Sequence, residues 1–214
     1  MNLIQETFNF DKKKLPTIKE IKSVIDIDCD DWTEKYNHNK NKNMNTFRIR
    51  DEYVKNNFSI LCHEFFISFD HMISDLNLKN ISELHSGIGW FTLWLKKYNI
   101  PISNCIDNMT WKYFKNRYLK HVEKKDSIEF VKNNSNIEMF ILSWPYMDNT
   151  AYNVWKAMRK GQYLFYIGED YSGCTANDNF FKAVEKKEVE DIWNLNKNFI
   201  SFWGIHDRPF LYRK

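Results

Sequence analysis

The sequence predicts an α/β protein with a mainly parallel, seven-stranded sheet, a C-terminal antiparallel hairpin and an N-terminal helical extension. Three observations carry this prediction. After residue 80, short apolar runs alternate with segments of helical periodicity, which is typical of βαβ units. The last two apolar runs are separated by a short turn, as in a hairpin. Before residue 51 the chain is polar and poorly periodic.

We divide the chain into an N-terminal extension, residues 1–50, and a predicted domain, residues 51–214. Apolar residues at helical spacing predict a short helix in 16–25. The Asn- and Lys-rich run 37–43 is low in complexity, so we expect an exposed loop there. In 58–76 apolar residues recur every three or four positions, which predicts one or two amphipathic helices.

The remaining elements follow from the same alternation of patterns. We expect strands at 81–85, 102–106, around 121–123, and at 138–142, 163–167, 199–203 and 210–212. We expect helices at 91–98, 109–119, 127–132, 150–160 and 178–192. Right-handed crossovers make the first strands parallel, and only the terminal hairpin reverses direction.

Composition limits the class of protein. The length of 214 residues fits one domain, and 17% aromatic residues predict a core rich in rings. A net charge of +3 permits an acidic partner without requiring one. The four cysteines lack CxxC spacing, so we expect reduced thiols and no metal site. No apolar run reaches membrane-spanning length, and we expect a cytoplasmic protein without a membrane partner.

A glycine-rich turn follows the first predicted strand. Gly87 and Gly89 lie between this strand and the next helix, where a glycine lets backbone N–H groups approach a ligand. Asp107 follows the second strand, 20 residues after Gly87, at a spacing that suits a carboxylate bonding ribose hydroxyls. The alternative is that the glycines only permit a tight turn and that Asp107 caps a helix.

With these residues the sequence resembles class I S-adenosylmethionine (SAM)-dependent methyltransferases. Their E-x-G-x-G-x-G turn is matched by Glu83, Gly87 and Gly89, while His85 stands at the first glycine. A side chain fits there if its φ is negative and space is available. The resemblance implies SAM as cofactor and these four residues as part of its site. It also implies that Asp107 holds the ribose, and that Asp126, or the following Ser127, lies near the adenine.

Three further motifs extend the resemblance over residues 58 to 214. They are Ser143-Trp144-Pro145-Tyr146, the run Gly168-Glu169 with Gly173-Cys174-Thr175, and Trp203-Gly204-Ile205-His206-Asp207. Together with the turn they are similar to a group of eukaryotic and viral methyltransferase-like proteins with W-P-P, G-E-x-x-G-G-C-T-G and W-x-G-I-H-D motifs. If the protein is viral, the cytoplasm is that of the host.

All these segments should project from one edge of the sheet, because ligands of open parallel sheets bind at the carboxyl ends of the strands. Ser143 and Tyr146 resemble the acceptor site of amino-directed nucleic-acid methyltransferases, in which an aromatic ring stacks on the base. Glu169 and His206 are the candidates for taking a proton from an acceptor. The alternative for the last motif is a structural turn around His206 and Asp207.

Three functions stay open at this point. The first is a SAM-dependent methyltransferase whose acceptor is a small molecule, a nucleic acid or a protein. The second is narrower, a nucleic-acid amino-methyltransferase. The third is a methyltransferase-like binding module without activity, because His85 replaces a glycine of the turn.

Overall fold

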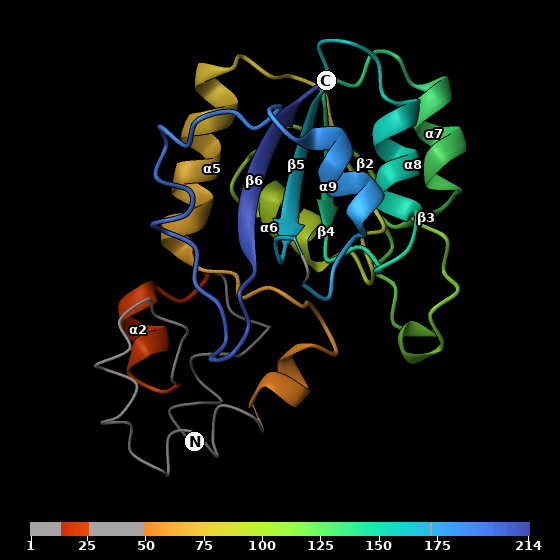
Figure 1. Ribbon diagram of the computed structural model, residues 1–214. Helices are drawn as coiled ribbons and strands as arrows, with labels where there is room; N and C mark the ends of the chain where they lie inside the picture. Colours follow the sequence, from red (N-terminus) through yellow and green to blue (C-terminus); the bar gives the residue numbers. More distant parts are fainter. Residues whose placement is uncertain (1–13, 26–48, 172) are drawn as a thin grey trace.

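The computed structural model describes residues 14–25, 49–171 and 173–214, and its centre is one mixed sheet (Figure 1). Its strands are β1 (Ile81–Leu84), β2 (Ile102–Asp107), β3 (Glu123–Lys124), β4 (Met139–Ser143), β5 (Tyr163–Gly168) and β6 (Arg208–Arg213). They lie in the order β3-β2-β1-β4-β5-β6. All neighbours pair in parallel except β6, which is antiparallel to β5. The mainly parallel, Rossmann-like sheet is therefore confirmed.

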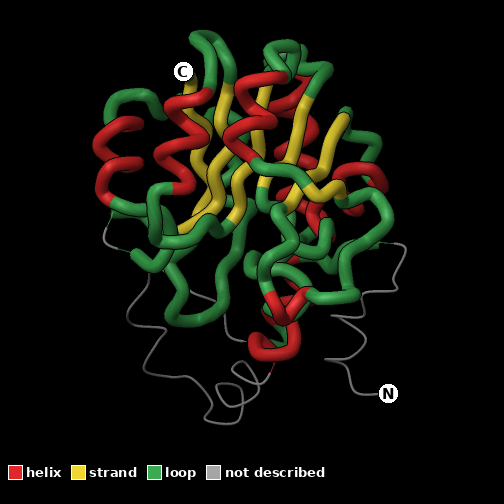
Figure 2. Tube along the Cα trace, turned by 90° about the vertical axis from the view of Figure 1, so that its right-hand side faces the viewer, coloured by secondary structure: helices red, strands yellow, loops and turns green. Residues whose placement is uncertain are grey.

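Helices cover both faces of this sheet, as Figure 2 shows. They are α5 (His63–Asp75), α6 (Trp90–Lys97), α7 (Ser127–Asn133), α8 (Thr150–Ala157) and α9 (Asp178–Val184). The short helix α2 (Ile18–Lys22) lies off the faces, below the sheet in Figure 1. Two apolar clusters lie on opposite sides of the strands. One holds side chains of α5 and α6, and the other holds side chains of α7, α8 and α9.

The strands of the centre are buried on both faces, which is why they read as continuous apolar runs. In β4, Ile141 packs into the cluster on the α5 side, whereas Phe140 and Leu142 pack into the other. All three are fully buried. Each such side chain stabilises the fold by about 1.5–3 kcal/mol. This packing fixes the strand register, and thereby the positions of the loops that leave the carboxyl edge.

Two expected helices are shorter than predicted. Within 109–119 only the 3-10 turn η1 (Lys112–Phe114) forms. The Asp107 carboxylate accepts a hydrogen bond from the Met109 N–H at 2.6 Å, and this competes with helical pairing. Met109 also has a φ of 58°, outside the helical region. In 178–192 the helix α9 ends at Val184, and the chain then turns toward β6.

The seventh strand, expected at 199–203, is absent from the described residues, so the sheet has six strands there. The outer edge of β6 is occupied by another segment. Val189 N–H donates to the Leu211 carbonyl at 2.7 Å, and Arg213 N–H donates to the Lys187 carbonyl at 3.0 Å. The backbone sites that 199–203 would need are therefore already paired.

The N-terminal segments lie next to the carboxyl edge of the sheet. In Figures 1 and 2, α2 and the helical turn at 49–53 sit below the ends of the parallel strands. The predicted helix after Pro16 is confirmed, and a Thr17–Glu20 capping box begins it. The loop expected at 37–43 lies outside the described residues. Across the described segments, no helix has the length and apolar character needed to cross a bilayer.

Candidate functional site

A cleft opens at the carboxyl edge, with about 660 Å³ of empty space including the part that is open to solvent. Four segments line the cleft. They contribute Asn56, Asn57 and Phe58; Glu83, His85, Ser86 and Gly87 after β1; Asp107, Asn108, Trp111 and Phe114 after β2; and Ser143, Trp144, Pro145 and Tyr146 after β4.

The glycine turn and the acid after β2 are in direct contact. Gly87 has a φ of 55°, and its N–H donates a 3.0 Å hydrogen bond to Oδ2 of Asp107. The other oxygen, Oδ1, accepts from Met109 N–H. Each carboxylate oxygen has further lone pairs, so Asp107 can still accept hydrogen bonds from a ligand in the cleft. The spacing of 20 residues thus brings these two groups together.

Glu83 forms the floor of the cleft. Its carboxylate accepts hydrogen bonds from the N–H and the hydroxyl of Thr92, in α6. Only 2% of the residue is exposed, and this burial raises the pKa of the carboxyl from 4.5 to about 7. Glu83 therefore braces the helix that follows the turn, and it lies beside the cleft with a carboxyl group that titrates near neutral pH.

His85 occupies the turn in a way that the sequence did not predict. Its φ is 50°, in the left-handed region, so the expectation of a negative φ is wrong. A hydrogen bond at 2.7 Å joins its Nε2 to the Ser127 hydroxyl at the start of α7. Burial lowers the pKa of the imidazole. The side chain lines the cleft, and this hydrogen bond holds the imidazole toward α7.

Two other residues expected to contact the cofactor do not line the cleft. Asp126 caps α7, and its Oδ1 accepts from Glu129 N–H at 2.8 Å. Gly89 begins α6 with a φ of 85°, and a Cβ on it would lie 2.4 Å from Cγ2 of Val122. Gly89 is therefore needed for close packing beneath the loop before β3.

The loop after β4 places Ser143, Trp144 and Tyr146 in the cleft. Trp144 has a φ of 50°, and its backbone N–H donates to the Ile167 carbonyl at 2.8 Å. This bond holds the loop against the end of β5. Burial raises the pKa of the Tyr146 phenol, so its O–H stays protonated and can donate a hydrogen bond.

Four partly exposed rings form what we call the aromatic wall: Phe58, Trp111, Trp144 and Tyr146. Phe58 stacks on Trp144 with centroids 5.6 Å apart and an interplanar angle of 21°. Trp111 stacks on Tyr146 at 5.2 Å and 15°. Behind Trp111 lies Phe114, stacked at 5.7 Å and 25°. Sequence patterns missed Phe58, because its partners are far away along the chain.

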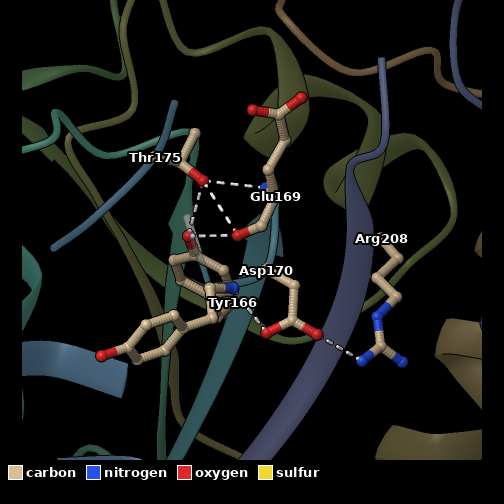
Figure 3. Close-up of polar contacts among 6 residues, drawn as sticks. Tyr166, Glu169, Asp170, Thr175 and Arg208 are labelled. Atoms are coloured by element: carbon tan, nitrogen blue, oxygen red, sulfur yellow. Dashed lines mark hydrogen bonds and ion pairs between the residues drawn. The ribbon is translucent and has the colours of Figure 1, made fainter. Parts of the chain in front are cut away.

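Glu169 and His206 lie at the same edge but do not line the cleft. Figure 3 shows the Thr175 hydroxyl bonded to Tyr166 and to the backbone of Glu169, while the Glu169 carboxylate points away from that cluster. This carboxylate accepts from Cys174 N–H at 2.6 Å and from the backbone N–H of His206 at 3.4 Å. Glu169 thus joins two loops, and the geometry does not place it at an acceptor.

Asp207 joins the last motif to the aromatic wall. Its Oδ2 accepts from the Trp144 indole N–H at 2.8 Å and from the Ser59 hydroxyl at 3.2 Å. Its Oδ1 is buried and has no hydrogen-bond partner among the described residues. Burial raises the pKa of this carboxyl. The sequence marked Asp207 as part of a motif, with a structural turn as the alternative, but nothing local connects it with Trp144.

Among the described residues, no three His, Cys, Asp or Glu side chains are grouped so that they could hold a metal ion. Three of the cysteines are free, and only Cys174 of these is exposed. Cys62 and Cys105 are buried, which raises the pKa of both thiols. Cys62 and Cys105 therefore belong to the packing of the fold.

Comparisons with known proteins give structural neighbours only. No protein-family model and no curated protein sequence matches the chain. A human N-acetylserotonin methyltransferase, solved in complex with SAM, is 10% identical with a TM-score of 0.43, over 71% of this chain and 50% of the enzyme. A SAM-dependent methyltransferase from Archaeoglobus fulgidus is 12% identical with a TM-score of 0.43, over 78% of this chain and 99% of that protein. A Burkholderia thailandensis 1,6-didemethyltoxoflavin-N1-methyltransferase, with S-adenosylhomocysteine bound, is 10% identical with a TM-score of 0.42, over 79% and 83%.

Proposed function

We propose that this protein is a SAM-dependent methyltransferase. The observation that carries the proposal is the contact between the Gly87 N–H and the Asp107 carboxylate, in an open cleft at the carboxyl ends of adjacent parallel strands. In Rossmann-like sheets this is the place where a glycine turn and an acid hold a nucleoside. The acceptor of the methyl group is not fixed by these two residues.

The residues around the turn fit such a cofactor. Asp107 offers lone pairs to ribose hydroxyls, and Gly87 presents backbone without a side chain. The Ser86 hydroxyl is buried at the cleft and has no hydrogen-bond partner among the described residues. A ligand that bonds it would remove the cost of an unsatisfied buried group, about 1–3 kcal/mol. Phe114 lies over Gly87 and closes this end of the cleft.

When bound, SAM supplies a methyl group on a sulfonium centre, which is transferred by in-line displacement. The protein's part in such a reaction is chiefly to position the two reactants and to exclude water. Ser143 and Tyr146 are the polar groups of the β4 loop that face an acceptor, and Tyr146 donates a hydrogen bond through its protonated phenol. Glu169 and the His206 backbone act indirectly, by holding the neighbouring loops.

The narrower reading, a nucleic-acid amino-methyltransferase, has less support. No lysine or arginine of the described residues lines the cleft, although proteins that bind nucleic acids neutralise phosphates with such side chains. The binding-module reading is favoured by one observation. His85 holds a positive φ and is tied to Ser127, beside the space that a nucleoside needs. Binding of SAM would distinguish the methyltransferase from the binding module.

The test is calorimetric titration of the purified protein with SAM and with S-adenosylhomocysteine. We expect both to bind, and Asp107→Ala to weaken both affinities by about 10- to 100-fold, since hydrogen bonds to charged groups contribute about 1.5–3 kcal/mol. Asp170→Ala is the matched control, because this carboxylate lies at the same edge and pairs with Arg208 outside the cleft. If neither ligand binds the wild type, the binding-module reading replaces the proposal.

A further inference from the structure

The acceptor half of the cleft is built from aromatic rings of three separate chain segments. Phe58 comes from the N-terminal side, Trp111 from the loop after β2, and Trp144 and Tyr146 from the loop after β4. Each ring keeps part of its surface exposed, and Tyr146 is 47% exposed. Large rings left partly in contact with water at a cleft are a feature of ligand-binding surfaces.

The rings of the wall are held in place by contacts outside the cleft. The Trp144 indole is fixed by its hydrogen bond to Asp207. The loop that carries Trp111 is tied to the N-terminal side by Arg117, whose guanidinium donates at 2.7 Å to the Lys55 carbonyl and to Oδ1 of Asn56. Flat faces fixed in this way lose little conformational entropy when a flat ligand binds.

The charge of the lining narrows the chemistry of the ligand. The charged or titratable side chains that the described residues bring to the cleft, apart from Tyr146, are Glu83, Asp107 and His85. Two of them are acids, and no lysine or arginine of the described residues lines the cleft. An anionic acceptor would therefore find no counter-charge among these lining residues. The other polar lining groups, such as Asn56, Asn57 and Ser143, suit neutral hydrogen-bonding partners.

We propose that the acceptor is an uncharged molecule with a planar aromatic ring, which stacks against the aromatic wall. That the bound molecule is a methyl acceptor rests on the proposed function. That a planar molecule binds here rests on the aromatic wall alone. Trp111 with Tyr146 and Phe58 with Trp144 are already near-parallel pairs, so a flat ligand would stack on the outer, solvent-exposed side of the wall, above all on Tyr146, which is 47% exposed. Asn and Ser side chains would orient polar substituents of the ring.

The experiment measures binding of one planar probe, dihydroxynaphthalene, to the full chain by ligand-observed NMR and calorimetry. Matched probes are naphthalenedisulfonate, which keeps the ring and adds negative charge, and decalindiol, which keeps the hydroxyls and loses the planarity. We expect dihydroxynaphthalene to bind at least tenfold more tightly than either one. We also expect Tyr146→Ala to weaken its binding by about tenfold, because the variant loses an aromatic face on which the probe stacks.

The control is Tyr171→Ala, since Tyr171 is 50% exposed, close to the 47% of Tyr146, and lies outside the cleft. It should leave probe binding unchanged. Equal affinity for decalindiol, tighter binding of the disulfonate, or equal effects of the two tyrosine variants would each overturn the inference. SAM is titrated in parallel. Probe binding without SAM binding would overturn the proposed function and support the aromatic site. SAM binding without probe binding would overturn the aromatic site and support the proposed function.

Discussion

The indole Nε1 of Trp144 donates a 2.8 Å hydrogen bond to Oδ2 of Asp207, across 63 positions of the sequence. This contact links the loop after β4 to the residue that precedes β6. It is the point at which the last sequence motif meets the aromatic wall. Asp207 is only 5% exposed, so the hydrogen bonds it receives matter more than they would at the surface.

Replacing Trp144 by Phe tests this link. The variant removes one of the hydrogen bonds that the buried Asp207 carboxylate accepts and leaves the bond from the Ser59 hydroxyl, so we expect a loss of about 1–3 kcal/mol in the free energy of unfolding. Trp193→Phe is the control, because its indole N–H donates to the exposed Asp75, and water can replace this donor in the variant. Urea denaturation measures both. Equal losses in the two variants would show that Asp207 does not depend on Trp144.

Glu83 should make stability depend on pH. Its pKa is raised from 4.5 to about 7 in the folded state. Below pH 4.5 the Glu83 carboxyl is protonated in both the folded and the unfolded state, so its titration does not lower the free energy of unfolding there. As the pH rises toward 7, the unfolded chain releases its proton first, and the free energy of unfolding falls.

Glu83→Gln removes this titration and keeps an oxygen for the Thr92 donors. At pH values above the folded pKa, the variant should therefore be more stable than the wild type, by about 3 kcal/mol for the full shift. Chemical denaturation from acid to mildly alkaline pH measures the slope. Glu129→Gln, at an exposed position, should retain the wild-type slope. A Glu83→Gln slope that matches the wild type would disprove the role given to burial.

Gly89 should tolerate no side chain. Gly89→Ala would place Cβ at 2.4 Å from Val122 Cγ2 and at 2.8 Å from His121 Nε2, at a φ of 85°. We expect a loss of about 2–5 kcal/mol, the sum of left-handed strain and overpacking. Gly204→Ala shares the positive φ, 76°, but has nothing within 4 Å, so it should lose only about 1–2 kcal/mol. Thermal unfolding of both variants gives the comparison, and similar midpoints would contradict the packing argument.

Local pattern was sufficient where the structure depends on neighbours in the sequence. The turn at Gly87 and the acid Asp107 could be placed because strand, turn and helix follow one another closely. The helix predicted over 109–119 was wrong, since Trp111 and Phe114 have helical spacing but their rings line the cleft. The role of Phe58 and the partners of Asp207 could not be predicted, because Phe58 stacks on Trp144 and Asp207 bonds Trp144 and Ser59, all more than 60 positions away along the chain.

The wall segment around Phe58 has a consequence for how this protein can change. Asn56, Asn57 and Phe58 reach the cleft from a stretch of chain that precedes every strand of the sheet, while Gly87 and Asp107 belong to the sheet itself. Exchanging residues 56–58 would remodel one rim of the cleft and leave Gly87 and Asp107 unchanged. The shape of the cleft can therefore evolve through three successive codons, with the scaffold left intact.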